Sequence, residues 1–219
     1  MINVGNKALK ALYRGSDAVK RVYRGRGLVW SARMLPPEYK QVKFLRNTQI
    51  DGYVSTDLNG SAYDYADITL QCYSLRSNRQ LMGHATNQAH YFGVSESGIF
   101  EIGSAATISK DYADPFSINV VRWEPGNERS DGYSKITING YTAKRDVLKR
   151  ISTTSFEFFT LNNSNYGGSY RIFGGKFYLA DGTLVGDFVP CMRISDDTLG
   201  MFDLVTNKFK PCVGTFTYE

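Results

Sequence analysis

The chain has few of the residues that build metal sites, catalytic dyads and disulfide frameworks. Its 219 residues include 3 cysteines and 2 histidines, and no two cysteines have the C-x-x-C spacing. Such a set argues against a zinc cage and a disulfide framework, although a single bridge between Cys191 and Cys212 is left open. His84 and His90 are the only available bases for a Ser-His-Asp triad, and each is better explained as a structural histidine.

Long apolar runs are also lacking. No segment approaches the ~20 consecutive apolar residues of a membrane-spanning helix, and the first thirty residues lack the continuous apolar core of a signal peptide. We therefore expect no membrane insertion, and synthesis in a reducing cytoplasm where the thiols stay reduced.

Aromatic residues and glycine are plentiful. The 15 tyrosines, 13 phenylalanines and 21 glycines, set against 6 prolines, are typical of strands joined by tight turns. An apolar content of 42% is enough for a packed core, so the composition argues against disorder. We predict an all-β fold.

Two dipeptides give the strongest local signals. Asn139-Gly140 and Asp181-Gly182 each separate two β-rich runs, and both favour the positive φ angles of a type I′ hairpin turn. Only residues 143–151 suggest a short helix. Turn signals spaced about eight to twelve residues apart favour a two-sheet antiparallel sandwich or jelly roll. Strands are expected over residues 39–45, 66–73, 90–94, 99–102 and 116–123.

A ten-residue unit occurs twice near the N-terminus, over residues 8–17 and 18–27, as apolar-apolar-Lys-x-apolar-Tyr-Arg-Gly. We predict one strand and one tight turn per unit, which gives a small β-meander over residues 1–34. Residues 35–37, with Pro36-Pro37, would form a linker to a main domain over residues 38–219.

A sheet this small is marginal by itself, so the N-terminal module is a candidate docking element. Its predicted anchors are Tyr13, Tyr23 and Trp30. The alternative is a satellite sheet that packs on its own domain.

The N-terminal region is also strongly basic. Residues 1–46 carry 11 basic and 2 acidic side chains, a balance of +9, whereas the remainder carries 15 basic and 19 acidic side chains, a balance of −4. The basic residues alternate with apolar ones at strand spacing, which favours a solvated strand face over a nucleic-acid-binding arm. Nucleic acid is therefore not an expected partner.

The C-terminal stretch of the chain, residues 171–217, resembles the closing strands of concanavalin A-like, laminin G-like jelly rolls from bacteriophage and prophage structural proteins. Residues 39–53 are similar to the opening strands of that group, and the N-terminal Tyr-Arg-Gly units are similar to short modules beside such domains in tail and fibre proteins. The resemblance covers about residues 38–219. The segments that carry it are residues 171–179, 181–185, 187–193, 200–205 and 214–217.

This resemblance implies a structural protein of a bacteriophage virion, in the tail, a fibre or a capsid decoration. The protein would be made in the bacterial host, attach through its N-terminal module, and form a homo-oligomer that contacts other virion proteins. Its lectin-like sandwich would recognise a host glycan or a neighbouring subunit. A free carbohydrate-binding module and a glycan-active enzyme are the alternatives.

The enzymatic branch of this group needs two carboxylates on one strand, in a Glu-x-Asp-x-x-Glu pattern. The nearest run spans Glu96–Glu101 and has Gly98 where the central aspartate should be. We therefore expect no catalytic residues and no cofactor. Asp57, Asp64 and Asp67 could supply ligands to a structural calcium ion, but they lack a calcium-loop pattern, so a solvated loop is the better explanation.

Sugar binding would need exposed aromatic rings beside amide or carboxylate groups, because a pyranose stacks its C–H face on a ring. The alternative for tyrosines in this chain is simple packing. The best glycan-binding group is Tyr63, Tyr65, Asn163, Asn165 and Tyr166.

Overall fold

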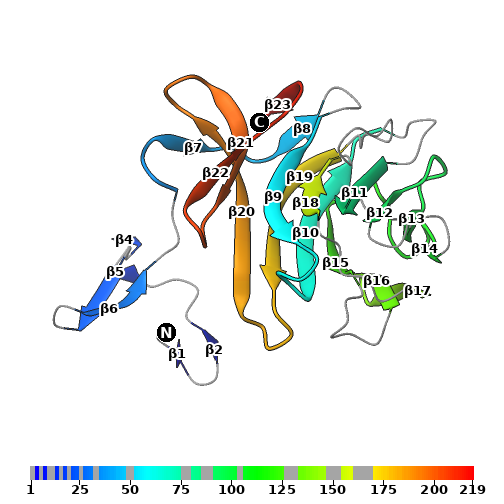
Figure 1. Ribbon diagram of the computed structural model, residues 1–219, viewed down its shortest axis with the longest axis horizontal. Helices are drawn as coiled ribbons and strands as arrows, with labels where there is room; N and C mark the ends of the chain where they lie inside the picture. The colour runs from blue at the N-terminus through cyan, green and yellow to red at the C-terminus, as the bar shows by residue number, and fades with distance from the viewer. Residues whose placement is uncertain are drawn as a thin grey trace. The chain divides into compact units, whose positions relative to one another are not determined.

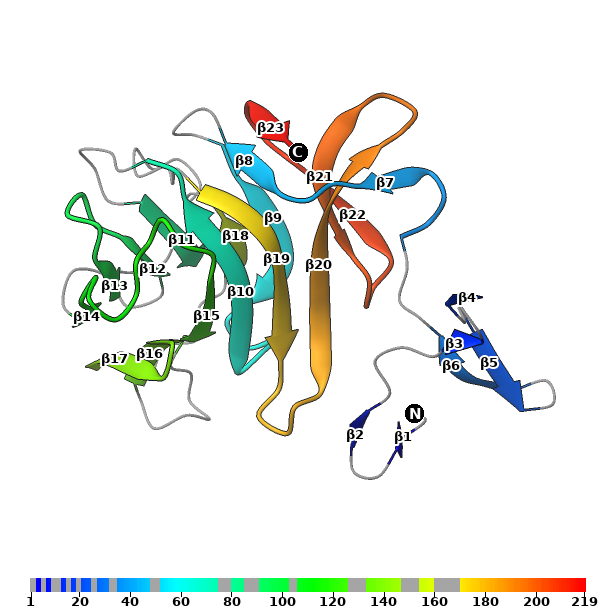
Figure 2. The same ribbon diagram turned by 180° about the vertical axis from the view of Figure 1, so that it is seen from behind.

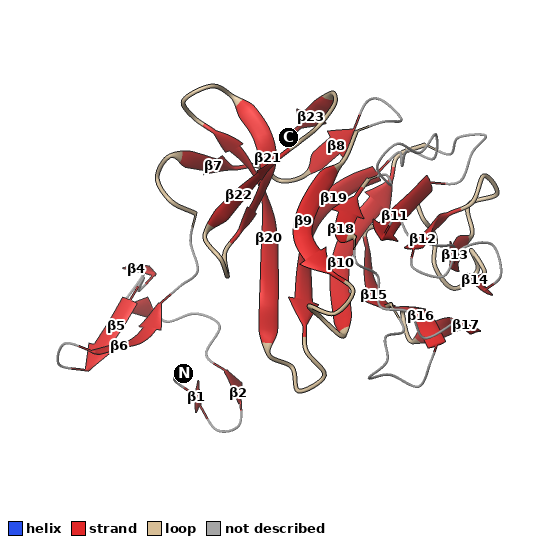
Figure 3. Cartoon of the chain, in the orientation of Figure 1, coloured by secondary structure: helices blue, strands red, loops and turns tan. Residues whose placement is uncertain are grey.

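The chain divides into two compact units, Met1–Pro36 and Pro37–Glu219 (Figure 1). The computed structural model describes residues 3–4, 7–8, 13–14, 17–18, 21–24, 27–31, 35–47, 52–74, 80–84, 91–102, 106–125, 133–146, 154–159 and 170–219, and only the backbone as far as residue 31. These residues contain strands and no helix (Figure 3). Among them, accordingly, no helix long and apolar enough to cross a membrane is found.

The described residues of the N-terminal unit form three antiparallel hairpins. They pair β1 (Asn3–Val4) with β2 (Lys7–Ala8), β3 (Tyr13–Arg14) with β4 (Asp17–Ala18), and β5 (Arg21–Arg24) with β6 (Gly27–Ser31). Among the described residues, each Tyr-Arg strand pairs with the strand that follows it, as two neighbouring strands of the expected meander would. Tyr13, Tyr23 and Trp30 lie on β3, β5 and β6, and their side chains are outside the described part of the structure.

The second unit contains a large antiparallel sheet of eleven strands. Its main path follows the order β17-β16-β15-β10-β19-β20-β21-β22 (Figures 1 and 2). Three short strands pair beside this path: β7 (Tyr39–Gln41) with β20, and β8 (Leu45–Asn47) with both β19 and β23 (Phe216–Tyr218). The strands of the main path are β10 (Tyr65–Cys72), β15 (Asn119–Glu124), β16 (Tyr133–Ile138), β17 (Tyr141–Asp146), β19 (Tyr170–Tyr178), β20 (Leu184–Arg193), β21 (Thr198–Asp203) and β22 (Lys208–Pro211).

A smaller antiparallel sheet of six strands follows the order β14-β13-β12-β11-β18-β9. Buried side chains from both sheets form one hydrophobic cluster, so the unit is a β-sandwich. This confirms the predicted all-β, two-sheet antiparallel fold. The strands of this sheet are β9 (Val54–Asn59), β11 (Gln80–His84), β12 (Tyr91–Val94), β13 (Phe100–Ile102), β14 (Ala106–Ile108) and β18 (Ser155–Phe158).

The centre of the core is aromatic. The Phe177 ring from the large sheet lies 5.1 Å from that of Phe156 and 6.1 Å from that of Phe158, both on the smaller sheet. It also lies 4.9 Å from the Tyr63 ring and 5.4 Å from the Phe188 ring. These edge-to-face contacts join the two layers, because aromatic rings favour such geometry over face-to-face stacking.

Strand β10 shows how the sequence specifies the outer face of the large sheet. Ala66, Ile68 and Leu70 are fully buried, whereas the residues between them are partly exposed. Side chains alternate between the two faces of a strand, so the polar members point to the outer face. The strand predicted at residues 66–73 is thus confirmed as β10, which ends one residue earlier, at Cys72.

Two other strand predictions need correction. The expected strand over residues 39–45 is split into β7 and β8, because Val42 and Phe44 turn their side chains into buried positions between two separate pairings. The strand expected over residues 116–123 begins only at Asn119. Phe116 and Ile118 are instead exposed and lie outside β15.

The hairpin at Asn139-Gly140 is confirmed, with positive φ at both residues (53° and 85°). The hairpin at Asp181-Gly182 has a different turn. Only Gly182 has positive φ there, and its N–H donates to the Leu179 carbonyl, as in a type I turn closed by a glycine bulge. The helix expected over residues 143–151 is wrong for residues 143–146. They belong to β17, which pairs with β16 along six residue pairs, and residues 147–151 lie outside the described residues.

Candidate functional site

A groove lies on the outer face of the large sheet where β19 and β20 separate. The two strands pair from Gly175 to Tyr178, whereas beyond Phe188 strand β20 pairs with β21 and then also with β7. A bulge in β19 adds to the opening, because Thr69 pairs with Gly174 while Leu70 pairs with Ile172. Bulges of this kind increase strand twist and often lie beside functional sites. The resulting groove has a volume of about 300 Å³.

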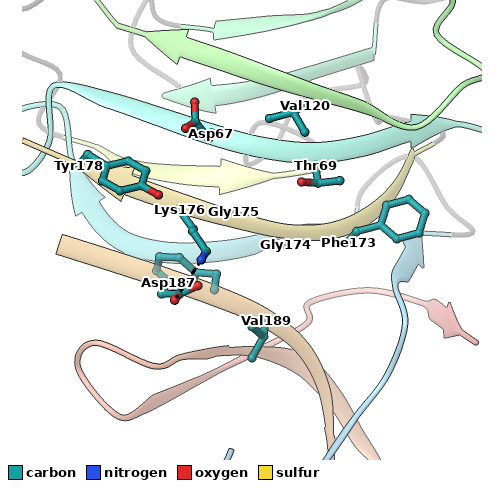
Figure 4. A pocket seen from close by; sticks show the side chains of 11 residues that line it. Asp67, Thr69, Val120, Phe173, Gly174, Gly175, Lys176, Tyr178, Asp187 and Val189 are labelled. Atoms are coloured by element: carbon teal, nitrogen blue, oxygen red, sulfur yellow. Dashed lines mark ion pairs between the residues drawn. The ribbon is translucent and has the colours of Figure 1, made fainter. Parts of the chain in front are cut away.

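The floor of the groove contains two glycines. Gly174 has φ +151°, and a Cβ atom there would lie 3.0 Å from the Phe188 carbonyl oxygen. A side chain at this position would therefore be strained. Around this floor, Figure 4 shows the lining side chains from β10, β15, β19 and β20.

Four charged side chains form one row across the sheet beside this floor. Arg122 of β15 pairs in register with Asp67 of β10, Asp67 with Lys176 of β19, and Lys176 with Asp187 of β20. Arg122 donates from Nε and Nη2 to the two Asp67 oxygens, at 2.8 and 3.0 Å. Lys176 points toward Asp187, with its Nζ 3.7 Å from a carboxylate oxygen (Figure 4). The Asp67 contact raises the pKa of Arg122.

An aromatic pair lies on one side of the charged row. Tyr65 stacks on Tyr178, with ring centroids 4.9 Å apart and an interplanar angle of 16°. The Arg122 guanidinium lies over the Tyr65 ring of this stack, 4.6 Å from its centroid. Partial burial raises the pKa of Tyr178, and nearby Asp67 adds to the rise. Tyr178 is therefore a neutral phenol that can both donate and accept a hydrogen bond.

Apolar side chains lie on the other side of the row. Val120 is 55% exposed, and with Phe173 and Val189 it lines the groove. In Figure 4, Phe173 and Tyr178 lie toward opposite ends of the groove. The site thus combines a neutral row of alternating charges with aromatic and aliphatic surfaces on its two sides.

The structure separates the predicted glycan-binding residues. Tyr65 lies on the outer face beside the groove, where it stacks on a lining residue. The prediction is wrong for Tyr63, which has no exposed surface and packs in the core, so it offers no ring face to a sugar. Asn163, Asn165 and Tyr166 lie outside the described residues.

Tyr63 instead belongs to a buried polar cluster with His84. The Tyr63 hydroxyl lies 2.8 Å from His84 Nε2, and His84 Nδ1 lies 2.8 Å from the Thr154 carbonyl oxygen. Since a carbonyl only accepts, Nδ1 carries the proton and Tyr63 donates to Nε2. Burial raises the pKa of Tyr63. The Trp123 indole N–H, whose geometry falls short of a hydrogen bond, opposes that rise.

Removal of this hydroxyl should destabilise the sandwich. We expect Tyr63→Phe to lower the free energy of unfolding by about 1–3 kcal/mol, because a buried acceptor on His84 loses its donor. Urea denaturation followed by tryptophan fluorescence measures the change. Tyr218→Phe, at an exposed position, is the matched control, and equal stability of the two variants would contradict the role of the Tyr63–His84 hydrogen bond.

The carboxylates considered for calcium point to different protein partners. Asp57 pairs with Lys210, Asp64 accepts the Ala180 N–H at 2.8 Å, and Asp67 is held by Arg122. Within the described residues, no group of three or more His, Cys, Asp and Glu side chains is placed to hold a metal ion.

The remaining candidate groups are also held apart or buried. Glu96 is exposed in the turn before β13, whereas Glu101 is buried on β13. Cys72, Cys191 and Cys212 are all free thiols. Burial raises the pKa of each thiol, that of Cys191 to about 12, which disfavours the reactive thiolate.

Comparisons with protein-family models, with curated proteins and with solved structures find no match for this chain.

Sequence reasoning missed most of the groove. Lys176, Tyr178 and Asp187 appear in the sequence only as parts of a hairpin, and Asp67 as part of a polar tract. The alternation of β10 identifies Tyr65, Asp67 and Thr69 as outward residues, but nothing local to the sequence shows which strands lie beside them.

Proposed function

We propose that this protein binds a saccharide through the groove of the large sheet, as a binding protein without catalytic activity. The observation that carries the proposal is the charged row Arg122–Asp67–Lys176–Asp187 with the stacked Tyr65–Tyr178 pair beside it. Sugar hydroxyls donate and accept at once, so alternating cations and carboxylates match them, while ring edges and apolar side chains cover the C–H groups.

The absence of catalysis in this proposal is supported by how the carboxylates are held. A glycoside hydrolase needs one carboxyl group free to protonate the leaving oxygen and a second to attack or to activate water. In the groove, Asp67 is engaged by both ends of the Arg122 fork, and Asp187 faces Lys176. The Asp67 side chain is 25% exposed and can still accept a hydrogen bond from a hydroxyl group, whereas the Asp187 side chain is 8% exposed and holds Lys176 in place.

We further propose that the sandwich is a jelly roll of the concanavalin A-like type and that the protein is part of a bacteriophage particle. The sequence resemblance of residues 38–219 and the separate, basic N-terminal unit support this setting. In this proposal the N-terminal unit attaches the protein to other virion proteins, and the groove faces a host glycan.

A binding experiment with the full chain tests the site. We expect retention on immobilised bacterial-surface polysaccharides, and a loss of about tenfold or more in affinity for Lys176→Met, because hydrogen bonds to charged groups contribute about 1.5–3 kcal/mol. Lys208→Met, at an exposed position on β22, is the control. Equal affinity of the two variants, or no retention on any polysaccharide, would contradict the proposed site.

The particle assignment needs its own measurement. Mass spectrometry of particles purified from a producing bacterial culture should detect the chain at a stoichiometric level. Its absence from the particles would refute the virion part of the proposal.

A further inference from the structure

The charged row is part of a longer polar row that crosses six neighbouring strands. Arg122 pairs in register with Thr137 of β16, and Thr137 with Thr142 of β17, so the row continues to the edge of the sheet. The two threonine hydroxyls lie 2.8 Å apart on exposed surface. The complete row is Thr142, Thr137, Arg122, Asp67, Lys176 and Asp187.

The length of this row exceeds one sugar ring. Neighbouring strands lie about 4.8 Å apart, so six strands span roughly 24 Å. The groove occupies only the part of the row from Asp67 to Asp187. A ligand that fills the groove alone would leave the Thr137 and Thr142 end of the row unused.

The row carries no net charge. Arg122 is balanced by Asp67, and Lys176 by Asp187. An anionic ligand would meet a carboxylate next to each cation, and a cationic ligand would meet the reverse. The alternation favours a ligand whose groups donate and accept in turn, which describes uncharged hydroxyl groups.

We infer that the ligand is a linear, uncharged polysaccharide that lies across the strands along this row, with Thr137 and Thr142 as an outer subsite. The inference rests on the proposed saccharide-binding function and assigns the substrate class and its direction. Tyr65 and Tyr178 would flank the polysaccharide on one side, and Val120, Phe173 and Val189 on the other.

Oligosaccharides of different lengths and variants at chosen positions of the protein test the inference together. The probes are linear, uncharged glucan, mannan and galactan oligosaccharides graded from the disaccharide upward, measured by titration calorimetry with the full chain. For at least one series, we expect the affinity to keep increasing with oligosaccharide length well beyond the disaccharide. The double change Thr137→Val and Thr142→Val should lower the affinity about thirtyfold for long members only, because two hydrogen bonds worth about 1 kcal/mol each are lost.

Three controls separate the outcomes. Thr107→Val, at an exposed position on β14 of the other sheet, should leave every affinity unchanged. Gln71 lies farther along β10 from the groove, so Gln71→Met tests a ligand that runs along the strand. If this change lowers the affinity for long oligosaccharides and the threonine changes do not, the proposed direction of the polysaccharide across the strands is overturned. Tighter, salt-sensitive binding of a linear uronate polymer would overturn the uncharged class.

Failure of the underlying function is distinguishable. If short and long oligosaccharides bind equally, and the threonine changes have no effect, the extended row is refuted while the groove stands. If no saccharide binds, the proposed function itself fails, and the inference fails with it.

Discussion

Substitution of Phe177 by alanine should cost the sandwich about 3–5 kcal/mol of unfolding free energy. Phe177 is fully buried, and its ring contacts those of Tyr63, Phe156, Phe158 and Phe188. Truncation to alanine would remove all four contacts and leave a cavity between the sheets. Because domains are stable by only about 5–15 kcal/mol, this one change would remove a large share of the total.

Equilibrium denaturation in guanidinium chloride measures the effect, with the midpoint shift at constant slope as the readout. Phe177→Leu should cost less than half as much, because it keeps most of the apolar volume. Phe116→Ala, at a position 46% exposed, should stay within about 0.5 kcal/mol of the unchanged protein. A loss for Phe177→Ala no larger than that for Phe116→Ala would show that the aromatic cluster does not join the layers.

The sequence predicts those elements whose cause is local. Asn139-Gly140 adopts the turn expected of it, since both residues take the positive φ that this dipeptide tolerates. Strand β10 follows from the period-two alternation of its eight residues. In both cases, the information lies within a few neighbouring positions.

Two elements are decided by strand pairing that their own residue pattern does not show. Residues 143–146 have a pattern compatible with a helix, but they continue a hairpin whose ladder with β16 satisfies their backbone groups. The run 39–45 alternates as one strand does, yet its two ends pair with different strands. Its first residues, in β7, pair with β20, whereas its last residue, in β8, belongs to a strand that pairs with β19. The competing tertiary contacts decide both outcomes.

The candidate site is the clearest case of this limit. Arg122, Asp67 and Lys176 are separated by 55 and 109 positions in the chain, and they meet only because β15, β10 and β19 are neighbours in the sheet. The groove further depends on a bulge that shifts the register after Thr69. Tyr63 and Tyr65 show the reverse problem, since two residues of the same type, two positions apart, are core and surface respectively.

Gly200 is the position where the smallest added group should have a large effect. A Cβ atom at Gly200 would lie 2.3 Å from the Lys210 carbonyl oxygen, and 2.6 Å from two atoms of the Phe209 ring. Strand β21 lies between β20 and β22, and Gly200 pairs with Pro211 on one side and Cys191 on the other. Because the closest atom belongs to the backbone of β22, relief requires that the strand itself move.

We therefore expect Gly200→Ala to lower the free energy of unfolding by about 3 kcal/mol or more, as overpacking with backbone displacement does. Gly140→Ala is the matched comparison, since Gly140 has φ +85° and no atom within 4 Å of the added Cβ. Its cost is conformational alone, about 1–2 kcal/mol. Thermal and chemical denaturation of the two variants separate these causes.

A second-site change identifies the atom responsible. If the Phe209 ring were the obstacle, Phe209→Ala would restore stability to the Gly200→Ala variant. We expect no such rescue, because the clash with the Lys210 carbonyl remains whatever side chain stands at position 209. A rescued double variant, or a Gly200→Ala protein as stable as Gly140→Ala, would refute the close packing of β22 on β21. Since β21 also pairs with β20, the same displacement should weaken the Lys176–Asp187 end of the groove. If the proposed saccharide binding holds, this effect is measurable as reduced saccharide affinity below the unfolding temperature.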